Sequence, residues 1–129
     1  MLETEGNHRK TLECSIPTAI IVDTSMIVKA PVSQTIGGIG DTIAKYTAVY
    51  DWSLAATAEG KPVDDFAYAI ACMCYDSVAY CDEKKFTSKS FLKILARALV
   101  MGGLAMEIAG SSRPCSGSEH LFCHAIEEY

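Results

Sequence analysis

From Asp41 to the C-terminus, apolar residues recur at spacings of three and four, the spacing of one face of an α-helix. Residues that end helices divide this stretch into four predicted helices. The first is expected to run from Asp41 to Gly60, the second over 64–81, the third from a cap at Thr87 or Ser88, and the fourth from near Gly117 to Tyr129. The pattern therefore predicts a mainly α fold, a helical bundle.

The inner faces of these helices follow from the same spacing. In the first helix the residues that follow this spacing are Ile43, Thr47, Tyr50 and Leu54. In the second helix the expected inner residues are Phe66, Ile70, Met73, Ser77 and Val78. The third helix contains the pair Gly102-Gly103, which costs about 1 kcal/mol per glycine relative to alanine. We expect a neighbouring helix to approach closely there, with a kink as the alternative.

The residues before the bundle have a different pattern. Ile16–Asp23 is a short apolar run rich in β-branched residues, which predicts one short buried β-strand. A single strand has no ladder partner in a chain that is otherwise helical, so its backbone groups need partners from elsewhere. We expect a disordered or frayed N-terminus over 1–13, a strand and linker over 14–36 with a glycine-rich turn at 37–40, and a helical domain over 37–129.

Composition excludes several classes of protein. With 129 residues and a net charge of −5, the chain is one domain without a basic surface, so nucleic acid is not an expected partner. No run of 18 uncharged apolar residues exists, so no membrane span is expected. The six cysteines are expected to be reduced thiols in a cytoplasmic protein: Cys14, Cys72, Cys74, Cys81, Cys115 and Cys123.

The start of the fourth helix contains the most distinctive pattern. Ser116 and Glu119 fit the Ser-x-x-Glu capping box, in which each side chain satisfies a backbone N–H of the first turn. His120 and His124 then lie four residues apart on one helix face. Two imidazoles at one spot are typical of a divalent-metal site, and Asp41 is the candidate carboxylate ligand.

Each candidate also has a simpler reading. Asp41, after three glycines, is most simply a helix N-cap. Either histidine can be an exposed or hydrogen-bonded side chain, and Lys45 can be a salt-bridge partner one turn after Asp41. Arg113, in a serine-rich loop, is either an anion-binding residue or a solvated charge.

Two blocks of the sequence resemble the glycerol-1-phosphate dehydrogenases. They are GIGDTIAKYTAVYDWSLA (38–55) and GSSRPCSGSEHLFCHA (110–125). These enzymes belong to the superfamily of iron-containing alcohol dehydrogenases, glycerol dehydrogenases and dehydroquinate synthases. Residues 17–23 are similar to the family's last strand before its helical domain, so the resemblance extends over 14–129.

The resemblance implies roles for five residues. Asp41 and His120 match metal ligands of the family, and His124 matches a histidine that lines the substrate site in the dehydroquinate synthase branch. We therefore expect His124 to orient the substrate or to relay a proton during catalysis. Lys45 or Arg113 would then bind the substrate phosphate. The implied cofactors are a divalent metal (zinc, nickel or iron) and, in the intact enzyme, NAD or NADP.

The family's nucleotide-binding domain and its further histidine ligand have no counterpart in these 129 residues. The resemblance therefore predicts a fragment of the enzyme, acting on a polyol phosphate, that is inactive alone. Such a fragment should associate with itself or with the missing parts. The alternatives are a non-catalytic helical interaction module, or a fragment of a glycerol dehydrogenase or dehydroquinate synthase.

Overall fold

The structure is a computed structural model that describes residues 2–3, 9–10 and 16–128. Within them, two short strands, β1 and β2, pair antiparallel, with Leu2 opposite Lys10 and Glu3 opposite Arg9. The expectation of a frayed end falls mostly on residues outside the described ones. The elements are β1 Leu2–Glu3, β2 Arg9–Lys10, α1 Thr24–Ile27, α2 Val32–Glu59, α3 Asp65–Ala79, α4 Lys89–Ala109 and α5 Ser118–Glu128.

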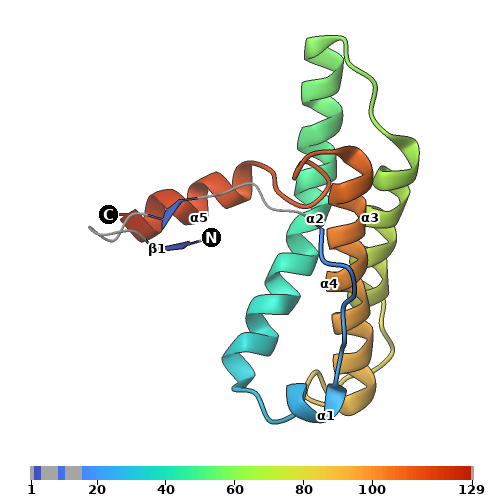
Figure 1. Cartoon of the computed structure of the whole chain (residues 1–129), viewed down its shortest axis with the longest axis vertical. Coiled ribbons are helices and arrows are strands. Elements are labelled where there is room, and N and C mark those ends of the chain that lie inside the picture. The colour runs from blue at the N-terminus through green and yellow to red at the C-terminus, as the bar shows by residue number, and fades with distance from the viewer. Residues whose placement is uncertain (1, 4–8, 11–15, 129) are drawn as a thin grey trace.

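The mainly α fold class is confirmed. The long helices α2, α3 and α4 lie side by side as a bundle, and α5 points away from it near the middle of α2 (Figure 1). The most extensive packing is between α3 and α4, followed by that between α2 and α3. The N-terminal end of α2 lies near the short helix α1 (Figure 1), which packs on α4.

The strand predicted over Ile16–Asp23 was wrong. This segment has no strand or helix assignment and runs along α4, where Val22 and Thr24 line a shallow cavity with residues of that helix. The side chains of Ile20, Ile21 and Val22 are all exposed. A strand needs a neighbouring strand that supplies ladder hydrogen bonds, and the described residues provide none for this segment. The backbone hydrogen bonds that the Asp23 carbonyl accepts, from Met26 and Ile27, belong to the start of α1.

Helix α2 begins at Val32, well before the predicted start at Asp41. Pro31 occupies the N-cap position, and the glycine-rich stretch 37–40, predicted to be a turn, lies inside the helix. A Cβ atom on Gly38 would lie 3.4 Å from side-chain atoms of both Leu95 and Leu99, so α4 packs closely at this point. Asp41 is therefore an interior helical residue, and its interpretation as an N-cap was wrong.

The ends of α3 and α4 follow local capping chemistry. The carboxylate of Asp64 accepts a 2.8 Å hydrogen bond from the Ala67 N–H at the start of α3. The hydroxyl of Ser88 accepts one of 3.1 Å from the Phe91 N–H at the start of α4. Gly60 after α2 and Gly110 after α4 have left-handed φ angles of 65° and 61°, which glycine adopts without strain.

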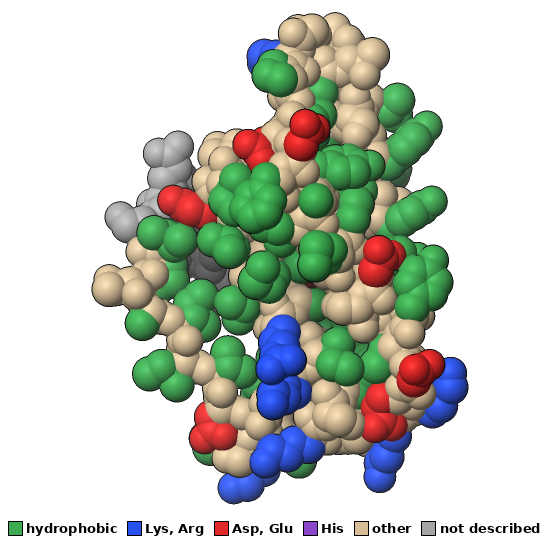
Figure 2. All heavy atoms as spheres, turned by 90° about the vertical axis from the view of Figure 1, so that its right-hand side faces the viewer, with side chains coloured by type: hydrophobic (Ala, Val, Ile, Leu, Met, Phe, Trp, Pro, Cys, Tyr) green, Lys and Arg blue, Asp and Glu red, His purple; other side chains and the backbone are tan. Residues whose placement is uncertain are grey.

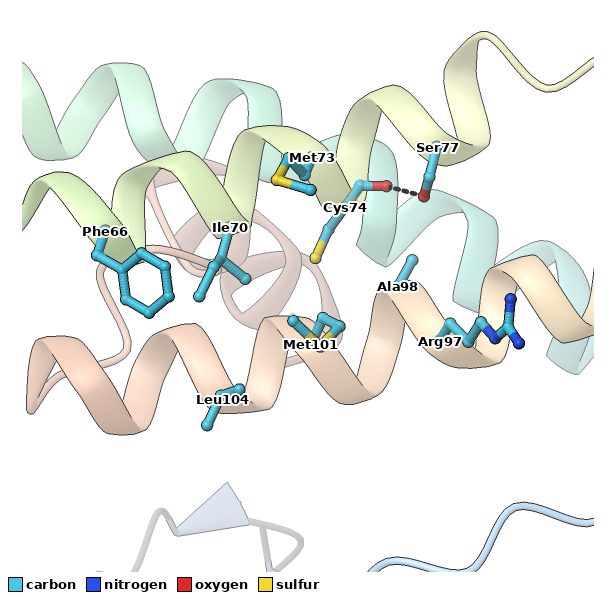
Figure 3. Close-up of a pocket in the computed structure, with 9 residues that line it drawn as sticks. All are labelled: Phe66, Ile70, Met73, Cys74, Ser77, Arg97, Ala98, Met101 and Leu104. Carbon is cyan, nitrogen blue, oxygen red and sulfur yellow. Dashed lines mark hydrogen bonds between the residues drawn. The ribbon is translucent and has the colours of Figure 1, made fainter.

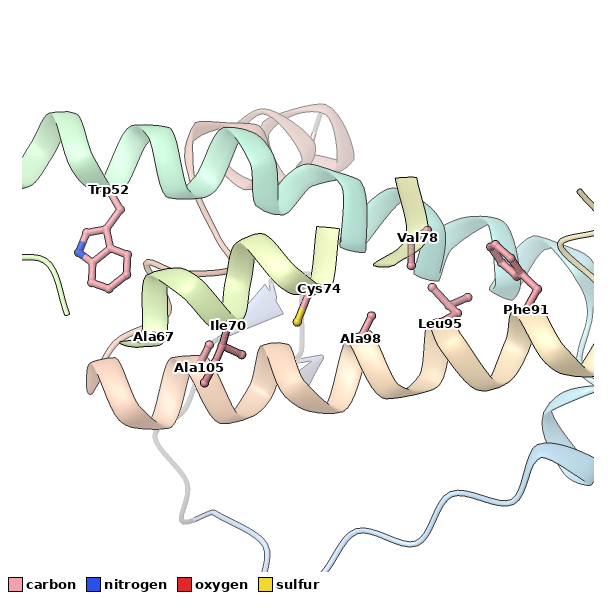
Figure 4. Packing of buried hydrophobic residues seen from close by; sticks show 9 residues of the cluster. All are labelled: Trp52, Ala67, Ile70, Cys74, Val78, Phe91, Leu95, Ala98 and Ala105. Atoms are coloured by element: carbon pink, nitrogen blue, oxygen red, sulfur yellow. The ribbon is translucent and has the colours of Figure 1, made fainter. Parts of the chain in front are cut away.

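The core lies between α2, α3 and α4 and contains many small residues. Ala48, Ala67, Ala71 and Ala105 have no exposed surface. Small side chains allow the helix backbones to approach one another, and larger residues fill the remaining space. Figure 4 shows the main cluster of the core, which consists of Trp52, Ala67, Ile70, Cys74, Val78, Phe91, Leu95, Ala98 and Ala105.

The surface keeps many apolar side chains exposed. Figure 2 shows them spread over the side formed by α3 and α4, with Lys and Arg side chains gathered toward the end near α1. Helix α5 also exposes Leu121, Phe122 and Ile126. In the described part of the chain, no helix is both long enough and apolar enough to cross a membrane.

Candidate functional site

The first turn of α5 is attached to α2 by polar contacts. The carboxylate of Asp51 accepts a 2.8 Å hydrogen bond from the Ser118 N–H. A Cβ atom on Gly117 would lie 2.9 Å from the Cα of Ala48, so only glycine fits without moving backbone. This close approach holds the start of α5 at a fixed point on α2.

Glu119 caps the first turn of α5, but with a different hydrogen bond from the one that the capping box predicts. Its Oε1 atom accepts a 2.8 Å hydrogen bond from the Gly117 N–H, whereas the capping box predicted a partner at Ser116. Its Oε2 atom lies 3.3 Å from the hydroxyl of Thr47 on α2, which also donates to the Ala44 carbonyl oxygen at 2.7 Å. The helix begins at Ser118, so the cap lies one residue later than the sequence pattern indicates.

The structure brings His120 and Asp41 together. The Nε2 atom of His120 lies 4.0 Å from Oδ1 of Asp41, and the other ring nitrogen, Nδ1, lies 3.0 Å from Oε1 of Glu119. Both His120 and Asp41 remain partly exposed. One nitrogen of the imidazole is thus held by a carboxylate, while the other faces a second carboxylate on α2.

His124 lies one turn further along α5. Its ring centroid is 6.4 Å from that of His120, in an edge-to-face arrangement. The two imidazoles therefore share one side of α5, as their spacing predicted.

Lys45 is buried beside Asp41, with only 2% of its side chain exposed. Its ammonium group donates to Oδ2 of Asp41 at 2.8 Å and to the Asp41 carbonyl oxygen at 3.1 Å. A buried charge is stable only when it is paired and hydrogen-bonded, and Asp41 provides both. The salt bridge predicted from the spacing is present.

A small cavity of about 170 Å³ joins these residues. Its wall includes Asp41, Lys45 and His120, together with Gly102, Cys115 and Ser116. A Cβ atom on Gly102 would lie 2.7 Å from Cε of Lys45, so the close approach expected at the glycine pair occurs at Gly102. At Gly103 a Cβ atom would meet no atom within 4 Å.

Arg113 lies elsewhere. Its guanidinium group is 3.4 Å from Oε1 of Glu59 at the end of α2, and both side chains are exposed. It is not part of the wall of the small cavity. Of the five residues expected to form the site, Asp41, Lys45 and His120 therefore line one cavity, and His124 lies beside His120.

Burial and hydrogen bonds shift three pKa values here. Burial raises the pKa of Glu119, but hydrogen bonds from the Gly117 N–H and from His120 outweigh it and leave the pKa below its ordinary value. Hydrogen bonds from Ser118 lower the pKa of Asp51. Burial raises the pKa of the Cys115 thiol to about 11, and this thiol donates to the Gly102 carbonyl oxygen at 3.2 Å.

Asp41 and His120 suit a divalent metal as a pair of ligands. Carboxylate oxygen and imidazole nitrogen bind zinc at about 2.0–2.2 Å, which places two donors of a tetrahedral site about 3.4 Å apart. The observed 4.0 Å is close to that separation. The described residues include no group of three His, Cys, Asp or Glu side chains that could hold a metal. The same pair also forms an ion pair whenever the imidazole is protonated.

A second cavity is separate from this site. It is an apolar groove of about 360 Å³ between α3 and α4 (Figure 3). Phe66, Ile70 and Met73 line it from α3, and Met101 and Leu104 line it from α4. It has few polar groups to orient a substrate, so its composition is that of a packing surface.

No protein-family model matches the chain. Curated relatives do match. The chain is 47% identical over 113 residues to the glycerol-1-phosphate dehydrogenase [NAD(P)+] of Pyrobaculum aerophilum, covering 86% of this chain and 33% of that protein. It is 39% identical over 124 residues to the enzyme of the same name from Methanococcoides burtonii, covering 95% of this chain and 35% of that protein. The chain is similar to one part of a glycerol-1-phosphate dehydrogenase.

A third relative has the same relationship. The glycerol-1-phosphate dehydrogenase [NAD(P)+] of Sulfurisphaera tokodaii is 45% identical over 114 residues, covering 86% of this chain and 32% of its own length. The chain thus spans about a third of the length of the curated relatives that it matches. The similarity to part of this dehydrogenase agrees with the resemblance seen in the sequence.

The sequence analysis missed several residues that build this candidate site. The roles of Asp51 and Gly117 in holding α5 were not predicted, nor was the buried thiol of Cys115. Asp51 lies in one of the two blocks that carry the resemblance, and Gly117 and Cys115 lie in the other. Their presence in these two blocks was the signal that could have identified them, but it does not indicate which residues contact each other.

Proposed function

We propose that this chain supplies the metal-binding part of a glycerol-1-phosphate dehydrogenase. The observation that carries the proposal is the approach of His120 Nε2 to Asp41 Oδ1 at 4.0 Å, from helices α5 and α2. Relatives named glycerol-1-phosphate dehydrogenase [NAD(P)+] support this choice of enzyme. The reaction proposed is the one that the family resemblance implies: hydride passes from a nicotinamide to the carbonyl carbon of dihydroxyacetone phosphate and gives sn-glycerol 1-phosphate.

In this proposal Asp41 and His120 hold a divalent ion, which is zinc, nickel or iron. When bound, such an ion supplies Lewis-acid polarisation of the substrate carbonyl. A hard carboxylate and a neutral imidazole are a donor set that all three metals accept. Lys45 pairs with the second oxygen of Asp41 and so fixes the orientation of the carboxylate.

The remaining residues act on the substrate. His124, as imidazolium, gives a proton to the oxygen that the reduction leaves as an alkoxide and becomes neutral imidazole, because imidazolium is a general acid at physiological pH. Two of the three N–H groups of the Lys45 ammonium donate hydrogen bonds to Asp41. The third can donate to a phosphate oxygen in the cavity. Arg113 would need to leave Glu59 to take that role, so Lys45 is the better candidate.

NAD or NADP is the hydride carrier in the proposal. These 129 residues contain no Gly-x-Gly-x-x-Gly turn, the motif whose helix N-terminus binds a dinucleotide pyrophosphate. The nucleotide would therefore be bound by other parts of the enzyme. The competing hypothesis, a non-catalytic helical module, predicts no metal binding by the Asp41–His120 pair.

Metal titration tests the proposal on the 129-residue chain. Isothermal titration calorimetry with Zn²⁺ and Ni²⁺ should give one weak site, which is lost in Asp41→Asn and in His120→Ala. Asp76→Asn, an exposed carboxylate on α3, is the matched control and should bind like the parent chain. If the parent chain binds neither metal, or if the first two variants bind unchanged, the proposal is wrong.

A further inference from the structure

A histidine that binds a metal through one ring nitrogen almost always donates its other N–H to an acceptor. That hydrogen bond selects the tautomer and fixes the plane of the ring. In this chain the Nδ1 atom of His120 lies 3.0 Å from Oε1 of Glu119, the residue immediately before it. The opposite nitrogen, Nε2, is the atom that faces Asp41.

Glu119 is itself held at both oxygens. Oε1 also accepts the 2.8 Å hydrogen bond from the Gly117 N–H. Oε2 lies 3.3 Å from the Thr47 hydroxyl, whose single proton it shares with the Ala44 carbonyl oxygen at 2.7 Å. The first contact ties the carboxylate to its own helix turn, and the second ties it to α2, the helix that carries Asp41. The side chain is only 25% exposed, so water competes weakly for these contacts.

We propose that Glu119 is the positioning residue of His120. It accepts the Nδ1 proton, so the neutral imidazole presents an unprotonated Nε2 toward Asp41. A metal ligand needs this lone pair in a fixed direction. The ligand role of His120 rests on the proposed function, whereas the choice of tautomer depends only on the contacts of Glu119.

Among the residues that the structure describes, the other charged and titratable groups near the ring are engaged elsewhere. Asp41 faces Nε2, and Lys45 is paired with Asp41. The ring of His124 packs edge to face against the ring of His120. Removing Glu119 should therefore release the ring to the Nε2–H tautomer that free histidine favours.

The test measures tautomer and metal affinity separately. Nitrogen-15 NMR of the side chains, recorded in the neutral state, should show His120 as the Nδ1–H form in the parent chain and as mainly the Nε2–H form in Glu119→Ala. The chain has three histidines, so His120→Asn assigns the signal. Zinc affinity should fall about 10- to 100-fold in Glu119→Ala.

Two further variants separate positioning from folding. Glu119→Gln keeps an acceptor for the cap but removes the charge, so its zinc affinity should lie between those of the parent and Glu119→Ala. Asp51→Asn alters the attachment of α5 without touching His120, and it should leave the tautomer unchanged. Circular dichroism checks that each variant retains its helices.

The outcomes are distinct. An unchanged His120 tautomer in Glu119→Ala overturns the inference, even if zinc affinity falls. The same tautomer shift in Asp51→Asn also overturns it, because the effect would then come from docking of α5. If the parent chain binds no zinc, the proposed metal site is wrong, while the tautomer measurement still decides the role of Glu119.

Discussion

Asp51, on α2, accepts a 2.8 Å hydrogen bond from the backbone N–H of Ser118, the first residue of α5. Helix α5 exposes its large apolar side chains, so its position relies on this bond and on the contacts of Glu119 and Gly117. The distance between His120 and Asp41 depends on the same contacts. The candidate site therefore forms only when α5 is attached to α2.

Acid should release α5 from α2. Hydrogen bonds lower the pKa values of Asp51 and Glu119 below the ordinary values of 3.8 and 4.5. A lowered folded-state pKa gives stabilisation that is complete above the ordinary pKa and is lost as the pH falls through the lowered one. Amide hydrogen exchange at Gly117 and Ser118 should therefore stay slow at pH 6 and accelerate, relative to α3, below about pH 4. Equal acceleration in α3 and α5 would contradict this.

Gly102→Ala and Gly103→Ala should change stability in opposite directions. At Gly102 the new Cβ atom would lie 2.7 Å from Cε of Lys45 and 3.2 Å from the Cys115 sulfur, so overpacking should cost about 1–3 kcal/mol. At Gly103 no atom lies within 4 Å, so alanine should stabilise the helix by about 0.5–1 kcal/mol. Urea unfolding followed by circular dichroism gives both values. Similar changes in the two variants would show that the space around Gly102 is not restricted.

Cys115 should resist alkylation in the folded chain. Its thiol is buried, and its pKa of about 11 leaves roughly one thousandth as thiolate at pH 8. Cys123, which is exposed on α5, should react with iodoacetamide first. Mass spectrometry of peptides after short labelling times measures the order, and labelling in guanidinium provides the control. Rapid modification of Cys115 without denaturant would contradict its burial.

The purified chain should associate with itself. Ile20, Ile21 and Val22 are exposed, and burying three such side chains is worth about 5 kcal/mol at 1.5–3 kcal/mol each. Exposed apolar surface of this extent marks interfaces. Light scattering should show a mass above 13.9 kDa that falls toward this value in an Ile20→Ser, Ile21→Ser variant. A monodisperse monomer at high concentration would exclude association.

Local sequence signals determined the helix class and several helix boundaries. The caps Asp64 and Ser88 were readable because a side-chain acceptor acts on an N–H only three residues away. The pairing of Lys45 with Asp41 was likewise local, since both lie one turn apart on the same helix.

Tertiary packing decided which face of α2 is buried. The larger apolar residues Ile43, Tyr50 and Leu54 follow the helical spacing of an apolar face, yet all three are exposed. On α3 the prediction that Phe66 and Met73 face inward was likewise wrong, because both are exposed, whereas Ile70 and Val78 are buried as predicted. The buried face instead includes Thr42, Ala48 and Trp52. Small residues let α2 approach its neighbours closely, and periodicity alone does not reveal which of two helical stripes the neighbours cover.

Some features of the candidate site follow from the sequence, and others depend on tertiary packing. The sequence by itself determined that His120 and His124 share a face, because helical geometry relates residues four apart. Only the tertiary structure decided that His120 faces Asp41, that Lys45 is buried beside it and that Glu119 contacts both helices. The contacts of α5 with α2 join residues far apart in the chain, and their distances depend on how α5 is attached to α2. The burial of Lys45 depends on the residues of other elements that pack around it.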